Sequence, residues 1–418
     1  MSVAPKTARW AVGGPAVDRR ALARCVADTT GFADAWGRRP LLASAAELPG
    51  PFDDLLDLDG VDELLSRRGL RTPFLRMAKD GAVVDSARFT RPGGVGAAIG
   101  DQVDDAAVAR LFAEGTTIVL QALHRLWPPI IDFAGALAGE LGHPVQVNAY
   151  ITPAASRGFS AHYDIHDVFV LQLTGEKRWI VHEPVHEWPL RTQSWTQHRA
   201  RVADTVATTE PTIDAVLRPG DALYLPRGFL HSAEALGDVS AHLTVGIHVV
   251  TRHALVEALL AEAEDVTELR EALPVGLDLS APDTLDDEVA TAIGLLVDRL
   301  RNVTPETVTS RLVQTLAGSM RPAPISPLAQ AAAADAVEAD TRVRLRPGLE
   351  VRPVTSDTGV ELCLPGETVK LDASLEDAVA ALLEDDSCVV DALPGDPDAV
   401  RGLVRTLLVR GVVVPDGD

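Results

Sequence analysis

Two histidines and two aspartates crowd the first six residues of the stretch HYDIHDVFVLQLTGEKRW, which covers 162–179. Residues two apart in a β-strand point to the same face, so His162 and Asp164 are expected to project together. An imidazole and a carboxylate on one face can bind one metal ion. His166 shares this face but lies roughly 13 Å from His162 along an extended chain, too far for ligand bonds of about 2 Å. A third ligand must therefore come from another segment.

The stretch RPGDALYLPRGFLHSAEAL, at 218–236, offers the best candidate for the third ligand. Turns at PGD and at PRG flank a short strand, and His231 follows at the start of the next strand. The 66 residues between Asp164 and His231 are enough for several barrel strands to bring them together. The alternative is structural: His162 and Asp164 form a surface turn, and His231 caps a hairpin.

Two histidines and one carboxylate leave three positions of an octahedral ion open, which suits Fe(II) oxygen chemistry. Zinc would accept the same ligands, but the lack of neighbouring cysteines and the need for open positions favour iron. Such an iron centre usually needs a two-electron co-substrate, and the commonest is 2-oxoglutarate. The far carboxylate of that dianion needs a buried cation.

The segment VFVLQLTGEKRWIV contains a candidate for this cation. A hairpin turn is expected at Thr174-Gly175, after which Lys177 and Trp179 alternate onto one face and Arg178 onto the other. Lys177 is then either an anion anchor or a surface lysine that extends its ammonium to water. Trp179 is expected in the barrel core rather than as a platform for substrate.

Polar residues on two other expected strands could complete the anion site. Asn148 and Tyr150 are two apart, so both could donate hydrogen bonds to the same carboxylate, and Thr244 could add a hydroxyl. His242 and His248 share strand parity with Thr244. They could line the pocket, but a place in the core or behind the pocket residues is favoured.

The elements that must position these residues follow from local patterns. Residues 146–250 carry short alternating or apolar runs separated by Gly, Pro and Asp, which is typical of a barrel or sandwich. Helical patterns cover 103–115 and 128–142, ahead of the strand-rich region. The barrel is therefore expected to hold all the candidate site residues.

The chain changes character after Thr251. A helical pattern follows, and Thr304-Pro305 supplies an N-cap with proline at the first helical position. Residues 319–330 form a proline-rich linker, and short strands with two helices over 341–418 indicate a winged-helix-type domain. This last segment carries 15 acidic and 8 basic residues, so direct DNA binding is not expected.

Composition limits the class of protein further. The formal charge is −22, from 38 basic and 60 acidic side chains, which argues against a nucleic-acid binder and would suit a basic protein or peptide partner, although acidity can also serve solubility alone. The sequence contains no apolar run of about 18 residues, which a membrane-spanning helix would need, and we expect no secretory signal at the N-terminus. The three isolated cysteines indicate neither a disulfide framework nor a CxxC zinc site. We expect a cytoplasmic protein.

Residues from about Trp36 to Thr251 resemble the JmjC-type 2-oxoglutarate oxygenases of the ribosomal oxygenase group, also called the cupin-4 family. The resemblance is carried by WGRRPLL, LRTPFLRMAKDG, NAYITP, GFSAHYDIHDVFVLQLTGEKRW, PGDALYLPRGFLHSA and HLTVG. An HxD motif alone is weak, whereas HxD followed by GxKRW and then LPRGxxH is specific.

The resemblance assigns roles to particular residues. It implies three iron ligands: His162, Asp164 and His231. It implies that Lys177 pairs with the distal carboxylate of 2-oxoglutarate, helped by three others: Asn148, Tyr150 and Thr244. His166 and Asp167 belong to the family motif but would not contact the metal. They are expected to be polar residues that order the backbone at the start of the strand.

The resemblance also implies an α+β architecture in three parts. These are a double-stranded β-helix catalytic domain with N-terminal helices over 1–251, a helical dimerisation segment and linker over 252–330, and a winged-helix-like domain over 331–418. The expected function is Fe(II)- and 2-oxoglutarate-dependent hydroxylation of an Arg or His side chain of a ribosomal protein, by a homodimer. The alternatives are an oxygenase acting on a small peptide or biosynthetic intermediate, and a non-catalytic metal-binding cupin that serves as a protein-interaction module.

Overall fold

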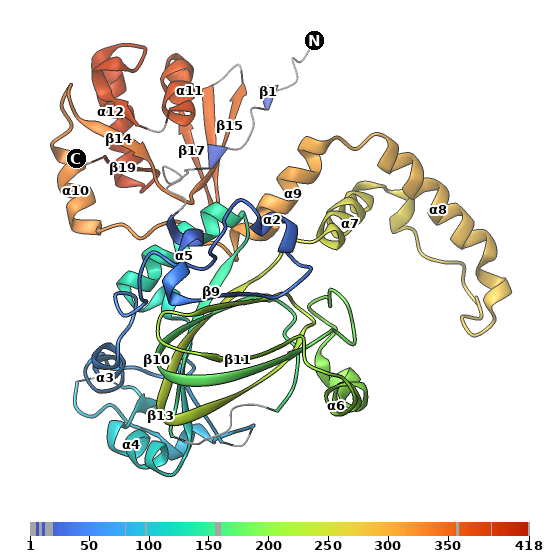
Figure 1. Cartoon of the computed structure of the whole chain (residues 1–418). Helices are drawn as coiled ribbons and strands as arrows, with labels where there is room; N and C mark the ends of the chain where they lie inside the picture. Colours follow the sequence, from blue (N-terminus) through green and yellow to red (C-terminus); the bar gives the residue numbers. More distant parts are fainter. Residues whose placement is uncertain are drawn as a thin grey trace. The chain divides into compact units, whose positions relative to one another are not determined.

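The chain folds into two compact units, Val17–Val249 and Val250–Asp418 together with Met1–Ala16. The computed structural model (Figure 1) describes residues 6–7, 11–12, 20–79, 81–96, 98–154, 160–356, 359–385 and 387–416. Among these residues, no helix combines the length and apolar character needed to cross a membrane. The predicted three-part division at 251 and 330 stays a prediction.

The Val17–Val249 unit is built on a nine-stranded antiparallel sheet in the order β3-β12-β10-β13-β9-β8-β4-β5, with β11 also pairing with β10. Its strands, with the separate pair β6 and β7, are β3 (Leu41–Ala43), β4 (Leu75–Lys79), β5 (Ala82–Val83), β6 (Thr90–Arg91), β7 (Gln102–Val103), β8 (Thr117–Leu120), β9 (Val145–Thr152), β10 (Asp167–His182), β11 (Ile213–Leu217), β12 (Ala222–Leu225) and β13 (Leu230–Ile247). Its helices are α1 (Arg20–Ala23), α2 (Phe32–Ala35), α3 (Leu58–Arg67), α4 (Asp105–Ala113), α5 (Pro128–Leu141) and α6 (Arg199–Thr208).

The long strands β10 and β13 form the centre of this sheet. They pair with each other along nearly their whole length, while β10 pairs with β12 over its first part and with β11 over its second part. The strands curve around a shared interior (Figure 1). The α+β class with a double-stranded β-helix core, predicted from the sequence, is confirmed.

The two faces of β10 pack into different cores, because successive side chains of a strand point in opposite directions. Phe169 and Leu171 join the large core that includes side chains from α2, α4 and α5. Val168 and Val170 join a smaller core with Trp179 on the interior face. Both faces are buried here, which explains the continuous apolar run at the start of the strand.

The expected hairpin turn at Thr174-Gly175 is wrong. These residues lie inside β10, at register shifts between Gln172 and Thr174 and between Thr174 and Glu176. Gly175 has a φ of 65°, and a Cβ there would lie 2.2 Å from the backbone oxygen of Val239, so only glycine fits. The irregularity is a bulge in a continuous strand rather than a reversal of the chain.

This bulge changes which side chains face the interior. Val168 and Val170, at even positions, point inward before it, whereas Lys177 and Trp179, at odd positions, point inward after it. Without the inserted step, strand alternation would place Lys177 on the face of Phe169. The backbone at Gly175 therefore carries Lys177 into the interior.

Helix boundaries in this unit agree with the expected signals. α4 begins at Asp105 with the Asp104 side chain accepting a hydrogen bond from the Ala107 N–H. α5 has prolines in its first turn and is capped by Gly142 directly after Leu141, where a φ of 69° suits a residue without a side chain.

The second unit contains a helical segment followed by strands and helices. Its elements are β1 (Lys6–Thr7), β2 (Ala11–Val12), α7 (Arg252–Ala261), α8 (Asp286–Arg301), α9 (Pro305–Ala317), α10 (Pro327–Asp335), β14 (Arg342–Leu345), β15 (Glu350–Ser356), β16 (Gly359–Leu364), β17 (Glu367–Leu371), α11 (Glu376–Glu384), β18 (Cys388–Val389), α12 (Pro397–Val409) and β19 (Val413–Pro415). β15 pairs with β16 and with both N-terminal strands, and β14 pairs with β18 and β19. A separate apolar core joins α10, α11 and α12 to these strands.

The three helices of the helical segment are tied together at one buried carboxylate. Glu262, directly after α7, is 3% exposed and accepts hydrogen bonds from Arg299 of α8 at 2.7 Å and from Arg311 of α9 at 2.9 Å. These hydrogen bonds hold the pKa of Glu262 below its ordinary value. The predicted start of α9 at the Thr304 N-cap is confirmed.

Candidate metal centre

His162 and His231 lie directly opposite each other in an isolated antiparallel bridge. The His162 N–H donates to the His231 carbonyl at 3.2 Å, and the His231 N–H donates to the His162 carbonyl at 2.8 Å. The expected regular strand from His162 onward is wrong, because β10 begins only at Asp167. The bridge still brings the two ligand-bearing segments together, as the spacing argument required.

The two imidazoles present the same nitrogen to a common point. Nδ1 of His162 lies 2.7 Å from the Ser160 carbonyl oxygen, and Nδ1 of His231 lies 3.1 Å from the Phe229 carbonyl oxygen. A proton on each Nδ1 satisfies these carbonyls and leaves Nε2 as the ligand atom. The ring centroids are 4.5 Å apart.

Asp164 completes the group. Its Oδ2 lies 3.7 Å from Nε2 of His231, and one ligand atom from each of the three residues lies within 4.8 Å of the others. Burial tends to raise the pKa of Asp164, but the surrounding imidazoles outweigh it and lower this pKa. Burial lowers the pKa of His231 to about 4, so its imidazole is neutral near pH 7. A carboxylate and a neutral imidazole are the forms that bind metal.

This donor set fits a divalent first-row metal ion. With ligand bonds of about 2 Å, ligand atoms on one ion lie about 3 to 4 Å apart, so small side-chain rotations suffice. Two nitrogens and one carboxylate oxygen form the facial arrangement that leaves coordination positions open. Among the residues that the structure describes, this is the one group of three such side chains placed to hold an ion.

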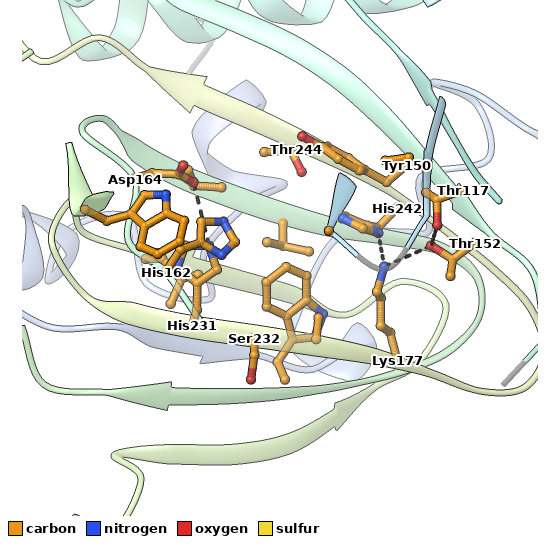
Figure 2. A pocket seen from close by; sticks show the side chains of 18 of the residues that line it. Thr117, Tyr150, Thr152, His162, Asp164, Lys177, His231, Ser232, His242 and Thr244 are labelled. Carbon is orange, nitrogen blue, oxygen red and sulfur yellow. Dashed lines mark hydrogen bonds and ion pairs between the residues drawn. The ribbon is translucent and has the colours of Figure 1, made fainter. Parts of the chain in front are cut away.

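The three side chains stand at one end of a cavity of about 280 Å³ inside the barrel. Figure 2 shows Lys177 at the other end of this cavity, with Tyr150 and Thr244 on the wall between. Lys177 is 3% exposed, so the surface alternative is wrong for this side chain, while Arg178 lies outside and pairs with Asp214. The alternation predicted for 177–179 is therefore confirmed.

Lys177 lacks a carboxylate partner among the described residues. Its Nζ donates to Oγ1 of Thr152 at 3.3 Å and lies 3.5 Å from Nδ1 of His242. Burial lowers the pKa of Lys177 to about 7, and burial together with the Lys177 charge lowers the pKa of His242 well below its usual value. A buried ammonium facing a cavity, with hydroxyl and imidazole groups beside it, is suited to an anionic group.

Two threonines at this end of the cavity were not predicted from the sequence. Thr152 lines it beside Thr117, and their hydroxyl oxygens are 3.5 Å apart. His242 also lines the cavity, so the alternative that the sequence left open holds for this residue and the favoured place behind the pocket residues is wrong. Its ring stacks on Tyr150, with centroids 5.2 Å apart and planes 7° apart. The signal for Thr152 was its place two residues after Tyr150, on the same strand face. Thr117 comes from β8, which no motif marked.

Asn148 and His248 do not line the cavity, and for His248 this is the placement that the sequence favoured. Asn148 is not among the residues that line the cavity, and its Oδ1 accepts a hydrogen bond from the Ala122 N–H at 3.0 Å. His248 stacks on His166 with centroids 5.4 Å apart, also away from the cavity lining. The part that Asn148 plays toward a co-substrate stays a prediction, as do the roles of Tyr150, Lys177 and Thr244.

Fold and site together define a class: an antiparallel β-helix barrel with a two-histidine, one-carboxylate metal centre at one end of its cavity. Residues 134–255 match the model of the JmjC domain family. This part of the chain is thus similar to a JmjC domain, and the predicted resemblance to the ribosomal oxygenase group is confirmed.

Relatives with curated names point to the same group. The chain is 35% identical over 176 residues to ribosomal oxygenase 1 of Rattus norvegicus, covering 40% of this chain and 29% of that protein. It is 37% identical over 140 residues to the bifunctional lysine-specific demethylase and histidyl-hydroxylase NO66 of Drosophila persimilis, covering 32% of this chain and 19% of that protein. The chain thus spans less than a third of the length of these relatives.

Solved structures share the fold over nearly the whole chain. The X-ray structure of Escherichia coli YcfD matches with a TM-score of 0.55 at 18% identity, covering 94% of this chain and 99% of that one. A structure of the same ribosomal oxygenase in complex with cobalt and 2-oxoglutarate matches with a TM-score of 0.52 at 18% identity, covering 93% and 98%.

Proposed function

We propose that this protein is an Fe(II)- and 2-oxoglutarate-dependent protein hydroxylase. The observation that carries the proposal is the placement of two complementary sites in one cavity. His162, Asp164 and His231 converge at one end, and the buried Lys177 stands at the other without a carboxylate partner among the described residues. A five-carbon keto dianion that chelates the metal and ends at an ammonium matches this arrangement.

In this proposal the chain's own residues bind the metal, orient 2-oxoglutarate and exclude water from the cavity. His162, Asp164 and His231 would hold the iron, and Lys177 would neutralise the distal carboxylate, with Thr152 adding a hydroxyl. When bound, iron with 2-oxoglutarate and O₂ supplies the oxidising power that inserts one oxygen atom into a C–H bond, leaving succinate and CO₂. Trp179 and the valines of β10 make the cavity wall apolar, which limits water near the reacting atoms.

The proposed substrate is an Arg or His side chain of a ribosomal protein. Two observations support this class: the relatives are named as ribosomal oxygenases and a histidyl-hydroxylase, and the chain carries a net charge of −22. Ribosomal proteins are basic, so an acidic enzyme would attract them over a distance. No direct DNA contact is proposed.

Purified protein with Fe(II), 2-oxoglutarate and large-subunit ribosomal proteins tests the proposal. We expect succinate formation that depends on those proteins, and a mass gain of one oxygen atom located on one Arg or His by fragmentation. Ribosomal proteins from cells lacking the gene should lack this mass gain. Succinate formed only with small peptides would favour the rival oxygenase, and metal binding with no succinate from any substrate would favour a non-catalytic module.

We propose in addition that the helical segment pairs two copies of the chain. Apolar side chains at least 40% exposed gather on α7 and α8: Leu255, Val256, Leu260, Val289, Ile293 and Val297. The three on α8 are spaced by four residues and share one face of that helix. Ile293→Asp should convert a dimer to a monomer in analytical ultracentrifugation, whereas Val409→Asp, at another exposed apolar residue, should not. A monomeric wild-type chain would contradict this.

A further inference from the structure

The motif WGRRPLL, at 36–42, contributes no side chain to the cavity, yet it contacts the barrel closely. The Gly37 N–H donates to the Tyr224 hydroxyl at 2.9 Å, and the Gly37 carbonyl accepts from the Trp188 indole at 2.6 Å. The Trp36 ring stacks on Tyr224 with centroids 6.0 Å apart and planes 11° apart. The motif therefore fixes the position of the Tyr224 side chain.

Tyr224 in turn holds a buried carboxylate. Its hydroxyl donates to Oδ2 of Asp167 at 2.5 Å, and both residues are 0% exposed. Oδ1 of Asp167 accepts from the Arg227 N–H at 3.0 Å and lies 3.7 Å from the Arg227 guanidinium. Burial raises the pKa of Asp167, and these partners oppose the rise. A buried carboxylate is costly, so two hydrogen bonds and an ion pair that keep Asp167 in place suggest a role beyond the stability of the fold.

Its position in the chain supplies the reason. Asp167 is three residues beyond Asp164, and Arg227 is four residues before His231. The same two segments are joined by the Gly228 N–H donating to the Asp164 carbonyl at 3.0 Å, next to the histidine bridge. Asp167 points to the opposite side of β10 from the cavity and is not among the residues that line it. It therefore acts at a distance from the ligand atoms.

We infer that the hydrogen-bond chain from Gly37 through Tyr224 and Asp167 to Arg227 is a positioning device for the metal centre. It locks the segment that bears Asp164 to the segment that bears His231, so that the ligand side chains keep one arrangement. Groups that orient ligands without touching the metal commonly contribute tenfold to a hundredfold in affinity. The inference rests on the proposed metal centre and gives the WGRRPLL motif a function within it.

Two substitutions in the full-length chain test the device with Co(II) alone as the probe. Tyr224→Phe deletes one hydroxyl and keeps the ring, and Asp167→Asn removes the charge. We expect Co(II) affinity to fall about tenfold to a hundredfold in each, with a changed visible spectrum of the bound Co(II) that reports altered ligand geometry. Thermal unfolding shows whether each variant is folded. If Asp167→Asn does not fold, the Co(II) affinity and spectrum of Tyr224→Phe alone test the inference.

Asp221→Asn is the matched control. The Asp221 carboxylate also accepts two backbone hydrogen bonds, from Ala45 and Arg218, each at 2.8 Å, but it does not join the ligand-bearing segments. It should lose stability and keep the wild-type Co(II) affinity and spectrum. Folded Tyr224→Phe with unchanged affinity and spectrum overturns the inference alone, whereas a wild-type chain that binds no Co(II) overturns the metal centre as well.

Discussion

Replacing Lys177 with methionine should stabilise the metal-free protein against unfolding. The same change should remove the affinity of the metal-bound protein for 2-oxoglutarate. Burial lowers the Lys177 pKa from 10.5 to about 7, so the unfolded chain binds this proton more tightly than the folded chain. The difference costs the fold about 4 kcal/mol at pH 7 and about 2 kcal/mol at pH 9. This free-energy cost has its full value below pH 7 and is absent above pH 10.5. The free energy of unfolding of the wild type therefore rises with pH through this window. Methionine keeps an unbranched side chain without the charge.

Urea unfolding of the metal-free protein at pH 7 and pH 9 measures this effect. Tryptophan fluorescence reports on unfolding of the unit that contains Lys177. Five tryptophans lie within this unit, Val17–Val249: Trp36, Trp127, Trp179, Trp188 and Trp195. Lys177→Met should exceed wild type by about 4 kcal/mol at pH 7, and by about half of that at pH 9. Lys79→Met, at an exposed lysine of the same unit, should show no such pH-dependent gain.

Repacking around the new methionine changes the free energy of unfolding by a similar amount at both pH values. The decisive quantity is therefore the difference between the stability gain at pH 7 and the gain at pH 9. A gain that is equal at pH 7 and pH 9 would refute the idea that a desolvated ammonium is stored in the cavity. Wild-type affinity for 2-oxoglutarate in the variant, measured by calorimetry with Mn(II) present, would remove Lys177 from the anion site. Both results together would leave Lys177 as a core residue.

Three other outcomes follow from the same geometry. His162→Ala and Asp164→Ala should each abolish Fe(II)-dependent succinate formation and weaken Co(II) binding at least about a hundredfold by calorimetry, and full turnover in either would refute the ligand assignment. The dissociation constant for 2-oxoglutarate should rise roughly fiftyfold from pH 7 to pH 9, because the charged form of Lys177 declines tenfold per pH unit above its pKa of about 7; a constant value across this range would contradict it. Gly175→Ala should lower the free energy of unfolding by about 3 kcal/mol, since its φ is 65° and its Cβ would collide with backbone, whereas Gly237→Ala, at a φ of 68° in open space, should cost about 1 kcal/mol in denaturant unfolding; equal costs would mean that the bulge tolerates a side chain.

The sequence was sufficient to predict which three side chains meet as the candidate metal centre, because residue type and segment order restricted the choices. His162, Asp164 and His231 meet as predicted, although the structural reason differs in part. The first two lie in an irregular segment rather than a strand, and the bridge to His231 aligns them. The three side chains still converge because a metal site needs only approximate side-chain directions from the backbone.

Details that depend on cross-strand packing could not be predicted. Thr174-Gly175 has the composition of a hairpin turn, and only the long pairing of β10 with β13 shows that the chain continues through it. Asn148 has the strand parity of Tyr150, but no pattern in the sequence indicates that its Oδ1 accepts a hydrogen bond from the Ala122 N–H of a neighbouring loop. Thr117 has no local signal, since its role arises from β8 lying beside β9.

The most direct test is a crystal structure of the protein with Mn(II) and 2-oxoglutarate under anaerobic conditions. One ion should be bonded at about 2.0 to 2.2 Å to Nε2 of His162, Nε2 of His231 and one oxygen of Asp164, with 2-oxoglutarate filling two further positions and its distal carboxylate on Lys177. An ion bound elsewhere, or 2-oxoglutarate that leaves Lys177 without a carboxylate, would contradict the proposed centre.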